Sequence, residues 1–163
     1  MRVSVFAVSV PCASPEELVA SLKKISGETR ITLQAFDSDV ILSKRMVEFS
    51  FFQAFKAFQE KSGFSESLSV EWLLRCAGTR SIQQAVKATG VKDCSRVVLG
   101  IAGEKFDSNS ILRLLGAKEK PALLKASAEK QARLAGFFKV PLSSSFPLED
   151  LVLEKIALLN LEK

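Results

Sequence analysis

Apolar residues alternate with polar or small residues in four segments of this chain, which is the pattern of strands with two unlike faces. These segments predict strands over residues 2–10, 30–36, 69–77 and 96–103. In the third segment Val70, Trp72 and Leu74 occupy alternate positions, and Gly78 then breaks the strand. This strand, with the helix expected after it, forms the centre of the predicted fold.

Apolar residues at helical spacing lie between and after these segments. Helices are predicted over residues 15–25, 43–60, 107–115, 121–135 and 148–159, with a further helix that ends at Gly90. Ser14 and Glu17 form a capping box at the start of the first helix, and Gly116 is placed to end the helix over residues 107–115. The boundaries are therefore marked by cap residues as well as by hydrophobic spacing.

The predicted strands and helices alternate irregularly, and the glycine-rich phosphate fingerprint of doubly wound sheets is absent. We expect an α/β (α+β) fold: a single globular domain over residues 1–163, with a small, mainly antiparallel sheet of about four strands covered by helices. No apolar run approaches the roughly 20 residues that span a bilayer, so no membrane partner is expected. The alternation in residues 2–10 favours a strand over a secretory signal.

The turn at Gly78 delivers a helix N-terminus with Arg80 beside it. Either Thr79 or Ser81 is suited to cap that helix. Unpaired backbone N–H groups and the helix macrodipole make such an end a place for an anion. Lys44 lies at the start of the long helix, where a cation is unfavourable, and this placement also points weakly to an anion.

Catalytic chemistry is sparse in this sequence. The chain has no histidine, which excludes Ser–His and Cys–His catalysis, and no nucleotide-binding or metal-ligand motif. We therefore expect no enzymatic activity, no cofactor and no metal. The three cysteines, an odd number without a C-x-x-C pair, predict reduced thiols in the cytoplasm and no disulfide framework. Cys76 is either an activated thiol beside the turn or, as we favour, an inert half-buried residue.

The net charge of +5 is unevenly placed. Residues 118–139 contain six basic side chains and two acidic ones. Such a segment is either an electrostatic footprint for nucleic acid or the solvated face of a helix, and charge alone favours the solvated face.

Two predicted helices are more apolar than one core stripe requires. The stripe of the helix over residues 43–60 consists of Val47, Phe51, Phe55 and Phe58. Phe49 and Phe52 lie beside that stripe, and the helix over residues 148–159 is apolar on more than one side. Each excess either widens the core or contacts a partner; for the two phenylalanines the core is favoured, and for the last helix the question is open.

The stretch EWLLRCAGTRSIQQAVKATGVKD resembles the small tRNA-binding subunit of the KEOPS complex, a family that includes the human PRPK-binding protein. The matching positions are Glu71, Leu73, Leu74, Ala77, Gly78, Arg80, Ile82, Ala85 and Gly90. The segment QAFKAF and the C-terminal PLEDLVLEKIALLNLEK are similar to the family as well. Ser81 and Met46 depart from it, since the family usually has glutamine and often histidine there.

The resemblance implies a non-catalytic subunit that binds the single-stranded 3′ CCA end of tRNA for threonylcarbamoyladenosine modification. It also implies docking on the kinase-like subunit of KEOPS, with the other subunits reached indirectly. The candidate RNA contacts are Lys44, Arg75 and Arg80, with backbone approach at Gly78 and Thr79. The candidate partner contacts on the last helix are Leu151, Ile156 and Leu159.

Two other functions compete with this one. The first is a protein-interaction module that regulates a kinase without binding RNA. The second is a small enzyme that acts on an anion at the Gly78 turn, which the lack of a general base disfavours.

Overall fold

A four-stranded sheet with strand order β2-β3-β1-β4 forms the middle of the protein. The computed structural model describes residues 1–142 and 145–161, so the last two residues of the C-terminal stretch lie outside it. The strands are β1 (Arg2–Ser9), β2 (Thr32–Asp37), β3 (Val97–Gly103) and β4 (Lys118–Glu119). Every neighbouring pair is antiparallel, which confirms the predicted α+β class and the small antiparallel sheet.

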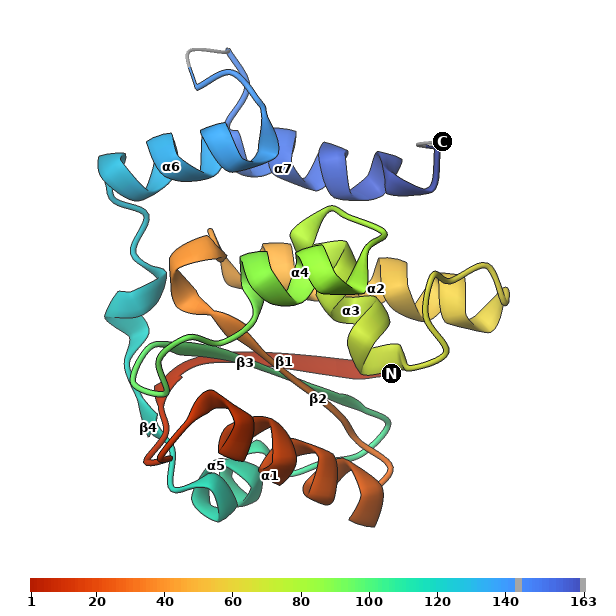
Figure 1. The fold of residues 1–163 in the computed structure, drawn as a ribbon, viewed down its shortest axis with the longest axis vertical. Helices are drawn as coiled ribbons and strands as arrows, with labels where there is room; N and C mark the ends of the chain where they lie inside the picture. The colour runs from red at the N-terminus through yellow and green to blue at the C-terminus, as the bar shows by residue number, and fades with distance from the viewer. Residues whose placement is uncertain (143–144, 162–163) are drawn as a thin grey trace.

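Helices cover both faces of this sheet (Figure 1). They are α1 (Pro15–Glu28), α2 (Lys44–Gln59), α3 (Leu68–Ala77), α4 (Ile82–Thr89), α5 (Ser108–Leu115), α6 (Ala128–Phe138) and α7 (Leu148–Ala157), with short 3₁₀ segments η1 (Ser38–Val40), η2 (Pro121–Leu124) and η3 (Leu158–Leu161). In Figure 1, α1 and α5 lie on one side of the sheet, α2, α3 and α4 lie on the other, and α6 and α7 lie beyond that second layer. The chain passes from α5 to α6 along one edge of the molecule, through β4 and η2.

The central segment is the main difference from the sequence prediction, because it forms helix α3 and not a strand. Every residue from Glu71 to Ala77 is buried, so the alternation of apolar side chains did not distinguish two faces. Gly78 ends the helix in the left-handed conformation, with a φ of 66°, and the N–H of Thr79 donates to the carbonyl of Leu74 at 3.2 Å. The fourth strand of the sheet is β4.

Two predicted helix ends also differ. Helix α1 continues through Gly27 to Glu28, and α6 runs through Gly136 to Phe138, with Lys139 as its C-cap at a positive φ of 56°. Pro121 begins the separate 3₁₀ segment η2, and Ser127 caps α6. The two glycines therefore lie inside the last turns of their helices, because a helix tolerates a single glycine at a cost of about 1 kcal/mol.

Trp72 of α3 anchors the core on the α2–α3 side of the sheet. It is fully buried, its indole N–H donates to the carbonyl of Val47 at 3.0 Å, and its ring lies 4.8 Å from that of Phe51. Of the predicted stripe on α2, Phe58 is 42% exposed, and beside it Phe52 is 48% exposed. The core thus takes residues along the whole of α2, including Ala54 and Ala57, and leaves Phe52 and Phe58 at the surface. The favoured core placement of Phe52 is therefore wrong.

We predict that Gly100→Ala will destabilise the protein by about 1–3 kcal/mol, because an added methyl group would overpack this core. A Cβ at Gly100 would clash with the ring of Trp72, lying only 2.5 Å from its Cζ2. Gly27→Ala in α1 is the matched control, since nothing lies within 4 Å of its added Cβ. Urea unfolding should show the control as stable as the wild type or more so; equal loss in both variants would contradict the close approach.

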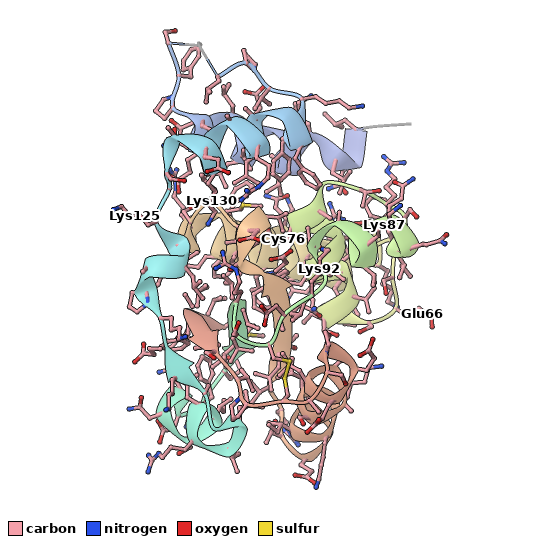
Figure 2. All side chains as sticks on the ribbon, turned by 60° about the vertical axis from the view of Figure 1, so that its left-hand side comes forward. Glu66, Cys76, Lys87, Lys92, Lys125 and Lys130 are labelled. Atoms are coloured by element: carbon pink, nitrogen blue, oxygen red, sulfur yellow. A yellow bond between two sulfur atoms is a disulfide. The ribbon has the colours of Figure 1, made fainter. Side chains whose placement is uncertain are left out.

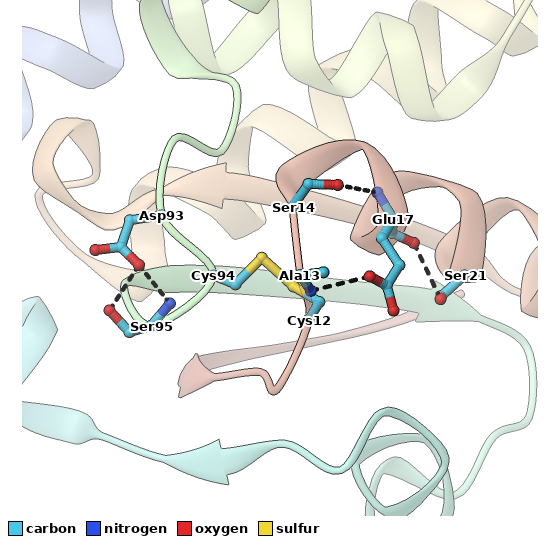
Figure 3. Close-up of a disulfide and its surroundings, with 8 residues drawn as sticks. All are labelled: Cys12, Ala13, Ser14, Glu17, Ser21, Asp93, Cys94 and Ser95. Carbon is cyan, nitrogen blue, oxygen red and sulfur yellow. Dashed lines mark hydrogen bonds between the residues drawn. A yellow bond between two sulfur atoms is a disulfide. The ribbon is translucent and has the colours of Figure 1, made fainter.

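A disulfide joins Cys12 and Cys94, so the prediction that the cysteines form no disulfide is wrong (Figure 3). Cys12 follows β1 and Cys94 precedes β3, and the antiparallel pairing of these strands brings the two ends together. The N–H of Val10 also donates to the carbonyl of Cys94 at 2.7 Å. Cys76 is the free cysteine; it is fully buried, and burial raises the pKa of its thiol to about 12. This supports the inert alternative for Cys76.

Within the described residues, no helix is both long and apolar enough to cross a membrane. The same part of the chain contains no group of three or more cysteine, aspartate or glutamate residues arranged to hold a metal ion.

Candidate nucleic-acid interface

The turn between α3 and α4 is ordered by its own side chains. Ser81 caps α4 by accepting a hydrogen bond from the N–H of Gln84 at 3.3 Å, which decides between the two predicted cap residues. The Thr79 hydroxyl instead accepts from the N–H of Ser81 at 3.2 Å. Gly78, Thr79 and Arg80 therefore form a short, fixed connection that ends at a helix N-terminus.

Arg80 is exposed at this turn and lies against an aromatic ring. Its Nη2 donates to the carbonyl of Leu159 at 2.9 Å, and its Cζ lies 4.9 Å from the ring centroid of Phe64. The hydrogen bond to Leu159 uses one of the five guanidinium N–H donors. An exposed guanidinium beside a ring provides both a phosphate donor and a flat surface.

Arg75 lies inside the protein, so its predicted contact with RNA is corrected. The side chain is fully buried; its Nε and Nη2 donate to Oε1 of Glu71 at 2.9 and 2.6 Å. Its Nη1 donates to Oδ1 of Asn160 at 2.7 Å. These partners hold Arg75 as a structural link between α3 and the C-terminal 3₁₀ turn η3.

Glu71 connects this buried pair to the preceding loop. Its Oε2 accepts hydrogen bonds from the N–H groups of Phe64 and Ser65, at 2.7 and 2.9 Å. The ring of Phe64 consequently lies over both arginines, with its centroid 4.7 Å from Cζ of Arg75. Sequence reasoning missed this role, although an acid and a base four residues apart are typical of a helix.

A shallow pocket of about 510 Å³ adjoins Phe64. It is lined by Phe58, Lys61, Gly63, Phe64, Ser65 and Glu66. Two aromatic rings and a lysine line this pocket, and Phe64 also contacts Arg80, so base-stacking surfaces and positive charge occur together, which is how single-stranded nucleic acids are held. Of these residues, sequence reasoning had noted Phe58 only as part of a core stripe.

Lys44 is exposed at the start of α2, but it is not part of this turn. It lines a different small pocket, whose walls come from β1, α2, β4 and η2. Its Nζ lies 5.9 Å from the ring centroid of Phe6. The structure therefore groups Gly78, Thr79 and Arg80 and leaves Lys44 apart from them.

The residues predicted for a partner surface on the last helix are not the exposed ones, which lie on the following segment η3. Ile156 and Leu159 are fully buried, and Leu151 is half-buried. The exposed apolar side chains of this region are Leu158, at 41%, and Leu161, at 74%. The excess of apolar residues is thus divided between the core and the surface, which sequence alone had left open.

Residues 12–160 match the family model described as kinase binding protein CGI-121. The chain belongs to the CGI-121 family. It is also 29% identical over 133 residues to the regulatory protein Cgi121 of Methanocaldococcus jannaschii, covering 82% of this chain and 86% of that protein. Membership of this family confirms the resemblance seen in the sequence. The family description names a kinase-binding protein, and the relative's name describes that relative as a regulatory protein.

Proposed function

We propose that this protein is a non-catalytic subunit of a KEOPS complex that binds the single-stranded 3′ CCA end of tRNA. In this function it also docks on the kinase-like subunit and supports threonylcarbamoyladenosine modification of tRNA. The observation that carries the RNA part is the exposed Arg80 guanidinium, which lies beside the Phe64 ring at the N-terminus of α4.

Unpaired nucleotides need two kinds of contact. Their phosphates accept hydrogen bonds, for which Arg80 has free donors and the α4 N-terminus has backbone N–H groups. Their bases stack on flat surfaces, for which Phe64 and Phe58 border a pocket with Lys61. Arg80 and Phe64 are held in place by α3, α4 and the loop bound to Glu71, while Phe58 lies on α2.

The residue chemistry favours an accessory role over catalysis. The chain has no histidine, and the Cys76 thiol, whose pKa is raised to about 12 by burial, stays protonated at neutral pH. We propose that the kinase-like partner contacts exposed apolar side chains, which occur on η3 as Leu158 and Leu161 and on α2 as Phe52. Large apolar groups at a surface are typical of protein interfaces.

We predict that Arg80→Glu will weaken the binding of intact tRNA about tenfold or more, because the charge reversal removes phosphate donors and repels the backbone. Phe64→Leu, which removes the ring and keeps an apolar side chain, should reduce the preference for intact tRNA over tRNA trimmed of its CCA end. Fluorescence anisotropy of labelled tRNA at two salt concentrations measures both effects.

The matched control for this experiment is Arg113→Glu on α5. Arg113 is exposed and, like Arg80, donates one hydrogen bond to a backbone carbonyl, but α5 lies on the other side of the sheet. Its reversal should change tRNA affinity much less than that of Arg80. Equal affinity of the wild-type protein for intact and trimmed tRNA would refute binding of the CCA end.

A second candidate function is regulation of a kinase without RNA binding, which the family description favours by naming a kinase alone. A stable complex with the kinase-like subunit, together with no tRNA binding at low salt, would select it.

The proposed tRNA function would place the protein in the cytoplasm. Thiols are mostly reduced there, so the state of the Cys12–Cys94 pair in the cell becomes a separate measurement.

A further inference from the structure

A second positively charged hollow lies at the edge of the protein where η2 leads into α6. This basic cleft has a volume of about 650 Å³. It is lined by Asp39, Arg96, Lys120, Pro121, Ala122, Leu123, Lys125, Ser127, Glu129, Lys130 and Arg133. Five of these side chains are basic and two are acidic, so the cleft carries an excess of positive charge.

Of the two carboxylates in the cleft, that of Asp39 already forms an ion pair with Arg96. Nη2 of Arg96 lies 2.6 Å from Oδ1 of Asp39, and this hydrogen bond lowers the pKa of Asp39, which therefore stays ionised. Nη2 of Arg133 donates to the backbone carbonyl of Asp39 at 2.9 Å. These contacts fix Arg96 and Arg133 on one wall of the cleft.

Lys130, which lies on α6 like Arg133, is the notable residue of the cleft because it is a buried cation. Lys130 is only 6% exposed, and its Nζ donates a hydrogen bond to the carbonyl of Leu123 at 3.0 Å. Within the described residues, no carboxylate lies within 4 Å of this ammonium. Burial, with help from Arg133 and Arg96 and against the attraction of Asp39, lowers the pKa of Lys130.

A buried cation that has no carboxylate in direct contact is unfavourable, and an anion bound in the cleft would relieve this. We propose that the basic cleft binds the phosphodiester backbone of RNA, at a site separate from the Gly78 turn. None of the described residues that line the cleft is aromatic, so it offers no ring on which a base would stack. Its lysines and arginines suit phosphate groups, whose recognition is independent of base sequence.

The position of the cleft suits a second contact with the same RNA molecule. In Figure 2, Lys125 and Lys130 lie toward one side of the protein, while Lys87 of α4, the helix that follows the Gly78 turn, lies toward the other. This inference rests on the proposed tRNA function: the turn holds the 3′ end, and the cleft holds phosphates elsewhere in the tRNA. In the sequence, the charge of residues 118–139 alone favoured a solvated helix face. Under this proposal the same residues bind RNA phosphates.

The test compares the full-length wild-type protein with a Lys120→Glu, Lys125→Glu double variant. Both lysines are exposed, so their replacement should leave the fold intact. Binding is measured by anisotropy with intact tRNA, CCA-trimmed tRNA and a short single-stranded RNA ending in CCA. Lys23→Glu, Lys24→Glu on α1 is the matched control, because it makes the same change of charge with exposed lysines away from the cleft.

We expect the cleft variant to weaken both forms of tRNA by a similar factor, about tenfold or more at low salt, and to leave the short RNA unaffected. The slope of log affinity against log salt should flatten by roughly 1.5–2, because two phosphate contacts are lost. The control variant should retain most of the wild-type affinity and slope.

Different failures separate the two proposals. A wild-type protein that prefers intact tRNA, with a cleft variant of unchanged affinity and slope, would overturn the cleft and leave the proposed function standing. Equal binding of intact and trimmed tRNA, with a strong loss in the cleft variant, would overturn the CCA function and retain backbone binding in the cleft. A wild-type protein that binds no tRNA would overturn both.

Discussion

Glu71→Ala is expected to destabilise the protein by about 3–5 kcal/mol, because it leaves the buried Arg75 guanidinium without its carboxylate. Both side chains of the pair are fully buried, so water cannot replace the lost partner. The substitution also removes the acceptor for the N–H groups of Phe64 and Ser65. The loop that carries the Phe64 ring should then loosen, and tRNA binding should fall along with stability.

Urea unfolding measures the change in the free energy of unfolding. Glu66→Ala is the matched control, since Glu66 is an exposed acid of the same loop (Figure 2) and its removal should change stability by less than about 0.5 kcal/mol. A Glu71→Leu, Arg75→Met double variant should recover much of the loss, because it removes both charges and fills the space. A loss of under about 1 kcal/mol in Glu71→Ala would contradict a structural role for the buried ion pair.

Reduction of the Cys12–Cys94 disulfide is expected to lower the free energy of unfolding by about 4 kcal/mol. The two cysteines are 82 residues apart, and a cross-link over so long a loop removes much conformational entropy from the unfolded chain. Denaturant unfolding with and without a reducing agent gives the difference. A Cys12→Ser, Cys94→Ser double variant is the control, because a reducing agent should not alter its stability.

A thiol reagent provides an independent check on this disulfide. The oxidised native protein should show no fast-reacting thiol, because Cys76 is buried and its thiol pKa is about 12. Reduction should make the half-buried Cys12 reactive. Fast reaction of Cys12 without prior reduction, or unchanged stability on reduction, would show that the pair is open in solution.

Much of the sheet was predictable because its strands follow simple alternation, as β1 and β3 do. Helix α3 was not, because it is buried on all sides and its apolar residues satisfy both the strand and the helix periods. The i, i+4 pair of Glu71 and Arg75 was the local signal for a helix. This pair was outweighed by the alternation of Val70, Trp72 and Leu74, which covers more residues. In the folded chain that alternation does not separate a buried face from an exposed one.

The remaining site features depend on contacts between distant parts of the chain. Cys12 and Cys94 lie close together because β1 and β3 are antiparallel neighbours, and this pairing cannot be read from the spacing of the cysteines. The basic cleft likewise needs Arg96 beside the segment that contains Lys130, and no sequence pattern places these together. Arg80 was predicted beside a helix N-terminus, and the structure has it there because its turn is encoded locally by Gly78 and Ser81.

The strand order has a consequence for how the chain folds during synthesis. Strands β1 and β2 are not paired with each other, and β3 lies between them. No native strand pair can therefore form until residues 97–103 have left the ribosome, although α1, α2 and α3 precede them in the chain. These early helices pack on β1 and β2, which become one sheet only when β3 joins them, so we expect the nascent protein to be most exposed to aggregation just before β3 emerges.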